Sequence, residues 1–210
     1  MIIVSLPIIG CGVFVMSTVI FGFWLKRYPS KRNAEITSRI MHFLMLSTLL
    51  FPMLTVWYTE FAYPEVINYD SLLGIASSPF RSIASVGGAV MMLVGFCIMA
   101  ISVVILLDRG QGLPGFALTK KIAANYIYKY TRNPMSLGFY ILSGAVGFLS
   151  GSTFLTMCAF ILIIPAHVFY LKFFEERELE IRFGQSYKEY KKRVPFLIPN
   201  FRGRIRIKNK

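Results

Sequence analysis

Two polar segments of an otherwise apolar chain carry the residue types that could do chemistry. The first is YIYKYTRNPMSLG, residues 126–138, which combines three alternating tyrosines with two cations and an Asn-Pro pair. The second is FFEERELEIRFG, residues 173–184, which begins with paired glutamates after two aromatic residues. Apart from Asp108, no carboxylate lies between Asp70 and Glu175, so an acid needed beside the first segment has to come from the second.

Each segment has an ordinary structural explanation when it is taken alone. Tyrosines and cations form the aromatic belt and the snorkelling anchors of a membrane interface, and Pro134 is suited to a first helical turn. The second segment is typical of a solvated helix start with two i,i+4 pairs, Lys172 with Glu176 and Glu178 with Arg182. Together, however, the two segments would form a pocket of aromatic faces, helix-start N–H groups, Arg132 and carboxylates. Such a pocket suits a zwitterion with a soft cation, and S-adenosylmethionine is a ligand of that kind.

The elements that must position these segments are membrane helices. The chain has 210 residues, is 55% hydrophobic, and contains several uncharged runs of the length that spans a bilayer. We expect spans within Met1–Leu25, Ile40–Tyr58 and Ile83–Leu107, and two more within Met135–Leu171 on either side of a turn at 150–152. The predicted fold is an all-α integral membrane protein with about five transmembrane helices and a C-terminal cytosolic interfacial helix.

The distribution of cations predicts the orientation of these helices. Segments 26–39, 108–134 and 172–210 hold 22 of the 23 Lys and Arg residues, and segment 59–82 holds one. Under the positive-inside rule the N-terminus lies outside and the C-terminus in the cytosol. The net charge of +13 then reflects topology and attraction of the basic C-terminal tail to anionic lipid headgroups, so no nucleic-acid partner is expected.

The first span is expected to remain in the protein, because Met1–Leu25 has neither a basic n-region nor a small-residue cleavage site. The membrane would be the cytoplasmic membrane in a prokaryote or the endoplasmic reticulum in a eukaryote. Cys11, Cys97 and Cys158 fall in separate spans and have no spacing typical of a metal or disulfide site, so we expect them to pack.

The two polar segments also carry a resemblance to a known family. The motif RNPMSLG at 132–138, preceded by YIYKY and followed by EERELEIRFGQSYKEYKKRVPFLIP at 175–199, resembles the membrane methyltransferase superfamily. This superfamily includes isoprenylcysteine carboxyl methyltransferases and phospholipid N-methyltransferases. The stretch DRGQGLPGF at 108–116 is similar to a Gly-rich loop that precedes the core of many bacterial members. The resemblance divides the chain into three N-terminal transmembrane helices, 1–107, and a methyltransferase core, 108–210.

The resemblance implies an S-adenosylmethionine site at the cytosolic face, under a tunnel that opens to lipid. The implied cofactor-binding residues are Tyr128, Tyr130, Arg132, Asn133, Pro134, Gly138, Glu175, Glu176, Tyr187 and Tyr190. Arg132 and Glu176 are also the catalytic candidates, together with His167. His167 is expected to be the only buried titratable group of the second half of the chain, either as a satisfied intramembrane histidine or as a substrate-side base.

Four positions depart from the family pattern. Tyr126 stands where the family usually has Gly, Asn133 where many members have His, and Ser136 where a Tyr is common. Leu171 stands where eukaryotic isoprenylcysteine enzymes have an Arg. The last departure shifts the expected substrate away from a prenylcysteine carboxylate and towards an amine or another lipid headgroup.

The predicted function is therefore S-adenosylmethionine-dependent methylation of a lipid or lipid-anchored substrate at the cytosolic interface. The protein's main contribution would be positioning and water exclusion, with proton removal where the nucleophile is an amine. Two alternatives remain at this point: a membrane reductase similar to sterol reductases, which would use NADPH, and a non-catalytic membrane scaffold.

Overall fold

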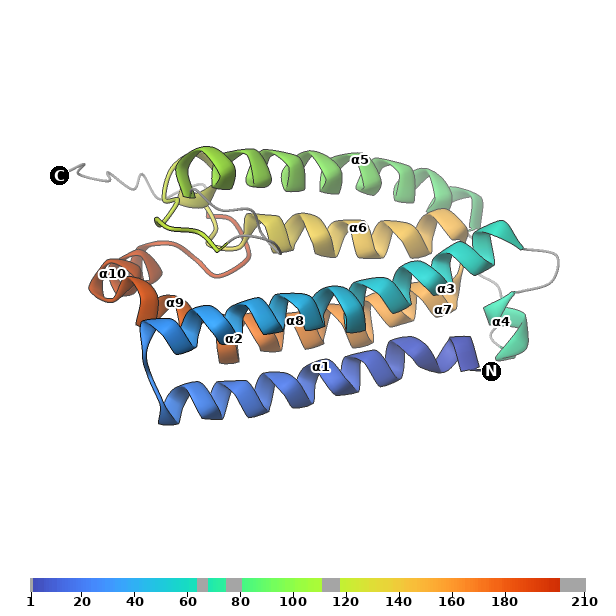
Figure 1. Cartoon of the computed structure of the whole chain (residues 1–210). Helices are drawn as coiled ribbons and strands as arrows, with labels where there is room; N and C mark the ends of the chain where they lie inside the picture. Colours follow the sequence, from blue (N-terminus) through green and yellow to red (C-terminus); the bar gives the residue numbers. More distant parts are fainter. Residues whose placement is uncertain (1, 64–67, 75–80, 111–117, 201–210) are drawn as a thin grey trace.

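The computed structural model describes residues 2–63, 68–74, 81–110 and 118–200, and every regular element in these ranges is helical (Figure 1). The helices are α1 Ile2–Arg27, α2 Lys31–Leu44, α3 Phe51–Ala62, α4 Tyr69–Leu72, α5 Arg81–Ile105, α6 Pro134–Ser150, α7 Thr153–Met157, α8 Ile164–Tyr170, α9 Glu176–Phe183 and α10 Gln185–Arg193. Short π-helical pieces are η1 Met45–Leu50, η2 Leu106–Gly110, η4 Cys158–Ile163 and η5 Leu171–Glu175, and η3 Tyr126–Lys129 is a 3₁₀ turn.

Five long helical segments run between the two ends of the bundle. Four of them are long and apolar enough to span a membrane: 5–27, 31–62, 83–108 and 153–183. The fifth, α6, has 17 apolar residues, which is at the short end of the range for a transmembrane helix. These segments confirm the predicted all-α membrane fold. Figure 1 shows α1 beginning at the end of the bundle where α4 lies, and α10 at the opposite end.

Two of the π-helical pieces have a local cause in proline. Proline lacks a backbone N–H, and its ring clashes with the carbonyl four residues earlier, which for Pro52 is Thr48 and for Pro165 is Ile161. Both carbonyls lie inside π turns, η1 and η4, whose wider turns accommodate the clash. The helices therefore continue through each proline. At η1, Gly10 of α1 approaches the Thr48 carbonyl so closely that an added Cβ would lie 1.9 Å from its oxygen.

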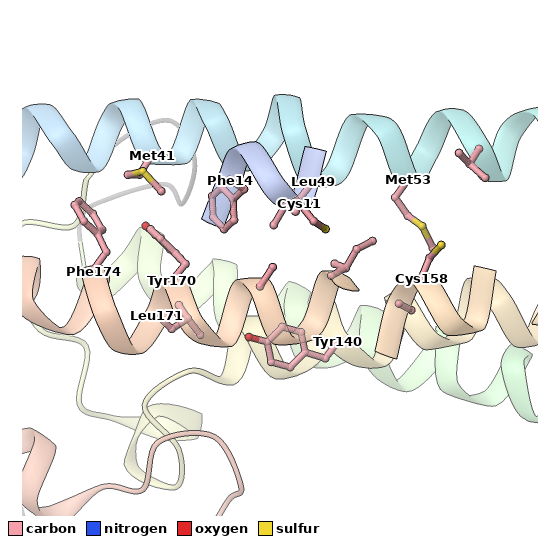
Figure 2. Packing of buried hydrophobic residues seen from close by; sticks show 14 of the residues in the cluster. Cys11, Phe14, Met41, Leu49, Met53, Tyr140, Cys158, Tyr170, Leu171 and Phe174 are labelled. Carbon is pink, nitrogen blue, oxygen red and sulfur yellow. The ribbon is translucent and has the colours of Figure 1, made fainter. Parts of the chain in front are cut away.

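The hydrophobic core lies between α1, the α2–α3 helix and the α7–α9 helix (Figure 2). Its fully buried members include Phe14 of α1, Met41 of α2, and Tyr170 and Phe174 of the last long helix. The Phe14 and Tyr170 ring centroids lie 5.3 Å apart, and the Tyr170 and Phe174 rings stack at 5.6 Å. Cys11 and Cys158 pack into this core as predicted, whereas Cys97 is exposed on α5.

Helices α5 and α6 pack through glycines. An added Cβ at Gly88 would lie 2.7 Å from Leu149 N, and one at Gly138 would lie 2.9 Å from Gly95 O. Gly88 and Gly95 thus allow the two helices to approach closely, since neither position leaves room for a side chain. Gly87 differs, because within the described residues nothing lies near its missing Cβ.

At the end of the bundle where α4 lies, Asp70 closes the hairpin between α6 and α7. The hairpin turns at Gly151, whose φ of 63° is the left-handed conformation that glycine adopts readily. The buried carboxylate of Asp70 accepts hydrogen bonds from Thr153 N at 2.8 Å and Phe154 N at 2.7 Å. Ser152 Oγ accepts a third, from Leu155 N at 3.3 Å. The first N–H groups of α7 are thus all paired.

Candidate functional site

The segment 126–133 leads into α6 through a 3₁₀ turn with an unusual start. Tyr126 has φ of 53°, in the left-handed region, and is the only non-glycine residue with positive φ among those described. A glycine adopts this conformation without the steric cost that a side chain brings. The backbone therefore explains why this position favours glycine in the family that the sequence resembles.

An irregular segment after α10 is hydrogen-bonded to this turn. Residues 194–200, defined here as the clamp segment, run beside residues 130–133. Arg132 N donates to Pro195 O at 2.9 Å, and Asn200 N donates to Tyr130 O at 3.0 Å. The side chains of Thr131 and Asn133 add hydrogen bonds to the carbonyls of Leu197 and Phe196, each at 2.9 Å. The predicted site turn is thus fixed by backbone groups more than 60 residues away in sequence.

Asn133 precedes α6 but does not cap it. Its side-chain amide donates to the clamp segment, and it makes no cap hydrogen bond to the helix. Pro134 occupies the first turn, as predicted, and has no N–H to satisfy. The next two residues, Met135 and Ser136, line a cavity. The start of α6 therefore directs its positive dipole end towards that cavity without a capping side chain.

Arg132 is the central cation of the site. Its side chain is only 9% exposed, and its Nη1 lies 3.0 Å from Glu176 Oε1. That contact is an ion pair without hydrogen-bond geometry, because neither Nε nor Nη1 of Arg132 makes a hydrogen bond within the described residues. Glu176 is engaged further by Lys191, whose Nζ lies 2.5 Å from Oε2. Arg132 therefore retains donors for an additional anion, whereas Glu176 is shared between two cations.

Glu175 differs from its neighbour. It lies in η5 and lines the cavity, and within the described residues its carboxylate has no ion pair or hydrogen bond. The π turn and the helical rotation between consecutive residues place Glu175 and Glu176 in different surroundings, as the sequence predicted. Of the two glutamates, Glu175 is the one left available for a cationic group.

Three tyrosines surround this charged group. Tyr128, Tyr187 and Tyr190 all line the cavity, and Tyr190 Oη donates to Tyr128 O at 2.7 Å. Burial raises the pKa of all three phenols. They are consequently neutral at physiological pH and add aromatic faces without adding negative charge.

The cavity has a volume of about 420 Å³, within the roughly 300–1,000 Å³ typical of small-molecule sites. Its lining divides by chemistry. The charged part includes Arg132, Glu175, Glu178 and Arg182, beside the phenols of Tyr187 and Tyr190. The other part, defined here as the apolar wall, is Met45, Leu46, Leu49, Leu50, Met99 and Phe139, from α6 and from two of the helices long enough to span a membrane. One cavity thus connects a charged site to a hydrophobic one.

The remaining predicted residues lie at different distances from this cavity. His167 lines it, and its Nδ1 lies 2.9 Å from Tyr140 Oη. Tyr130 contributes its backbone to the clamp and its ring to a contact with Lys129, 4.7 Å away. Gly138 does not line the cavity, because it lies where α6 crosses α5. Of the ten predicted cofactor residues, eight therefore line the cavity or, in the case of Glu176, pair with Arg132 beside it.

Two expectations about burial were wrong. His167 is not the only buried titratable group of the second half, since Glu178 and Tyr170 are each 1% exposed. The predicted pair of Glu178 and Arg182 does form, at 2.7 Å, but it is buried, not solvated. Arg182 also donates to Thr119 O and so holds residues 118–123 beside the cavity. The buried pair was missed because α9 packs against α2, a contact that the local charge pattern does not encode.

The site predicted from the sequence did not include α2. Ser38 and His42 of α2 line the cavity with the leucines of η1. The signal that was present was His42 itself, a polar ring in an otherwise apolar run.

Comparisons with known proteins agree with the second half of this architecture. Residues 83–186, about half of the chain, match the phospholipid methyltransferase family. Methanethiol S-methyltransferase 2 of Bradyrhizobium diazoefficiens is 35% identical over 80 residues, which are 38% of this chain and 29% of that protein. Methanethiol S-methyltransferase 1 of the same organism is 34% identical over 73 residues, 35% of this chain and 24% of the relative. The matches therefore cover less than a third of either relative's length. No solved structure is significantly similar to the chain.

Proposed function

Because residues 83–186 belong to the phospholipid methyltransferase family, we propose that the protein is an S-adenosylmethionine-dependent membrane methyltransferase. The cofactor would supply an electrophilic methyl group on a sulfonium. The rival functions, an NADPH-dependent reductase and a non-catalytic scaffold, are not favoured by the family match.

The observation that carries the proposal is the buried Arg132 with unbonded donors beside Glu175, which has no hydrogen bond or ion pair within the part of the chain that the structure describes. A buried guanidinium with free donors is costly unless an anion completes it. The carboxylate of S-adenosylmethionine would meet Arg132 and the uncapped start of α6, and its ammonium would meet Glu175. Glu176 would orient Arg132, because it is already bonded to Lys191. The neutral rings of Tyr128, Tyr187 and Tyr190 would contact the sulfonium and the base.

The acceptor would be a lipid or a lipid-anchored group that is methylated at the cytosolic interface. The apolar wall supports this proposal, since its residues belong to helices that are exposed to lipid on their other faces. An acceptor with an acyl or prenyl chain could then present its polar head to the charged end of the cavity. The basic C-terminal tail would hold this face against anionic lipid, at about 1 kcal/mol for each cation near the surface.

A small thiol is a second candidate acceptor. It is supported by the names of the two relatives, which are methanethiol S-methyltransferases, and by a cavity of limited volume. A thiol is weakly polar and partitions easily into an apolar chamber.

The orientation remains a prediction from charge, with the N-terminus outside and α10 in the cytosol. Single cysteines introduced near residue 65 and at Lys191, in a protein without its native cysteines, would be labelled from outside in intact cells. We expect label at 65 and none at 191, and label at 191 would reverse the orientation.

Binding and transfer test the function separately. Titration of the purified protein in nanodiscs with S-adenosylhomocysteine and with NADPH should give binding of the first only. Labelled methyl incorporation is then compared among phosphatidylethanolamine vesicles, a farnesylated cysteine analogue and an alkanethiol. Binding of NADPH alone, or of neither ligand, contradicts the proposal. The preferred acceptor identifies which of the two substrate classes is correct.

A further inference from the structure

The two histidines of the chain line the same cavity from different helices. His42 lies on α2 and His167 on α8, and the chain has no other histidine. His42 lies outside residues 83–186, so the family match says nothing about it. Polar side chains within membrane helices are costly and tend to be functional. His42 therefore calls for an explanation from its own surroundings.

The hydrogen bond of His42 determines which ring nitrogen carries the proton. Its Nδ1 lies 2.8 Å from Ser38 O, and the Ser38 hydroxyl is more distant at 3.4 Å. A carbonyl oxygen can only accept, so Nδ1 of His42 must donate. In the neutral imidazole the other nitrogen, Nε2, is then an unprotonated acceptor. Within the described residues Nε2 has no hydrogen bond, so His42 offers a basic nitrogen at the cavity.

Tyr170 supplies a matching donor. Its side chain is 1% exposed, it lines the same cavity, and its buried hydroxyl has no hydrogen-bond partner within the described residues. Figure 2 shows its hydroxyl directed from α8 towards α2, where Met41 precedes His42. The ring of His167 differs, because its Nδ1 pairs with the Tyr140 hydroxyl, which can donate or accept, so that contact does not determine the tautomer. His42 and Tyr170 thus present one vacant acceptor and one vacant donor to the cavity, and both groups are uncharged.

This pair is suited to a neutral molecule that carries its own proton. Of the two carboxylates that line the cavity, Glu178 is paired with Arg182, and Glu175 is proposed to meet the ammonium of the cofactor. An alkylammonium acceptor would therefore find no free counterion, and a carboxylate nucleophile would need no base. A neutral thiol fits both groups, because its S–H can donate to Nε2 while its sulfur accepts from the phenol. It also tolerates the neighbouring apolar wall.

We propose that His42 is the catalytic base of the methyl transfer and that the acceptor is a neutral thiol, held by the Tyr170 hydroxyl. This inference rests on the proposed methyltransferase function. The acceptor S–H proton passes to Nε2 of His42 as a sulfur lone pair forms the new S–CH₃ bond. The donor S–CH₃ bond breaks, and its electron pair stays on the donor sulfur, which leaves as the neutral thioether of S-adenosylhomocysteine. The proton gained by His42 is released to water after the product leaves.

The protonation of the ring can be measured without any turnover. In protein labelled with ¹⁵N-histidine, long-range ¹H–¹⁵N correlation spectra separate the two tautomers, and a His167→Gln variant assigns the two rings. We expect His42 as the Nδ1–H tautomer. An Nε2–H tautomer would overturn the inference, since the cavity would then meet a donor instead of a base.

Transfer to two thiols of different acidity tests the catalytic role. Full-length parent and His42→Gln proteins in nanodiscs are supplied with an alkanethiol, which is protonated at neutral pH, or an arenethiol, which is largely ionised. General-base catalysis contributes about 10²–10⁴-fold, so kcat for the alkanethiol should fall by about 10²-fold or more in the variant. With the arenethiol, which needs no base, kcat should fall by less than about tenfold.

The control is Phe43→Leu, which changes an exposed side chain on the same helix and should leave both rates unchanged. S-adenosylhomocysteine should bind parent and His42→Gln equally. Equal losses with both thiols, or no loss with either, would overturn the role of His42. A parent protein that binds S-adenosylhomocysteine but methylates neither thiol would overturn the acceptor assignment alone. A parent that binds no S-adenosylhomocysteine would overturn the proposed function, and this inference with it.

Discussion

The two ends of the helical bundle both bury polar side chains beside the start of a helix, but they differ in how those side chains are paired. At one end, Asp70 and Ser152 accept the first three N–H groups of α7. At the other, α6 starts without a capping side chain, and Arg132 has buried nitrogens without hydrogen bonds. Complete pairing stabilises the fold, whereas incomplete pairing leaves donors to which a ligand can hydrogen-bond. The comparison separates residues that hold the bundle together from residues that we propose bind a ligand.

The largest effect on ligand affinity is expected when the cation at the incompletely paired end is removed. Arg132→Ala should weaken binding of S-adenosylhomocysteine by about 2–5 kcal/mol, since it removes one partner of a buried charged contact. Its thermal unfolding should change little, because Glu176 keeps Lys191 as a partner. Calorimetry and thermal unfolding of the same preparation measure both quantities. Unchanged affinity would place the cofactor elsewhere.

The corresponding change at the completely paired end should lower stability and leave ligand affinity unchanged. Asp70→Ala leaves two N–H groups of α7 unpaired and should lower the free energy of unfolding by about 1–2 kcal/mol. Affinity for S-adenosylhomocysteine should stay at the parent value. Unfolding in detergent measures the first effect, and Asp70→Asn, which retains one acceptor, should lie between the two. A loss of affinity without a loss of stability would contradict the division between the ends.

A change at Asn133 tests whether the clamp segment positions the site. Asn133→Ala removes the hydrogen bond to Phe196 O and should lower affinity by about 1 kcal/mol through looser positioning of Arg132. Limited proteolysis after Arg193 should become faster, since the clamp segment is held less firmly. Asn133→Asp is the size-matched control and should be no better, because a carboxylate cannot donate to the carbonyl. Equal affinity and proteolysis in all three proteins would show that the clamp does not position the site.

The smallest effect is expected at Lys191. Its side chain is 35% exposed, and it contacts both Glu176 and Glu180. Lys191→Met should therefore change affinity by less than about 1 kcal/mol, and the change should shrink further at high salt. Calorimetry at two salt concentrations tests this. A loss as large as that of Arg132→Ala would place Lys191 inside the site.

The sequence predicted the fold and the charged half of the site from patterns that are local. Uncharged runs marked the five helices, and the scarcity of carboxylates before residue 175 linked Glu175 and Glu176 to Arg132, which the structure confirms for Glu176 at 3.0 Å. What could not be predicted depends on contacts between distant helices. The burial of Glu178 requires α2 to pack on α9, and the place of His42 in the cavity requires α2 to face α8. In apolar helices hydrophobicity is similar all round, so periodicity does not identify the face that lines a cavity.

The clamp segment links the site to the order in which the chain is synthesised. Residues 194–200 leave the ribosome after all five long helices, yet they supply the carbonyls that fix Arg132 and its neighbours. A nascent chain whose five long helices are already inserted in the membrane therefore still lacks the hydrogen bonds from the clamp segment to residues 130–133. We expect a chain truncated before residue 194 to insert its long helices but to lack the hydrogen bonds that position Arg132.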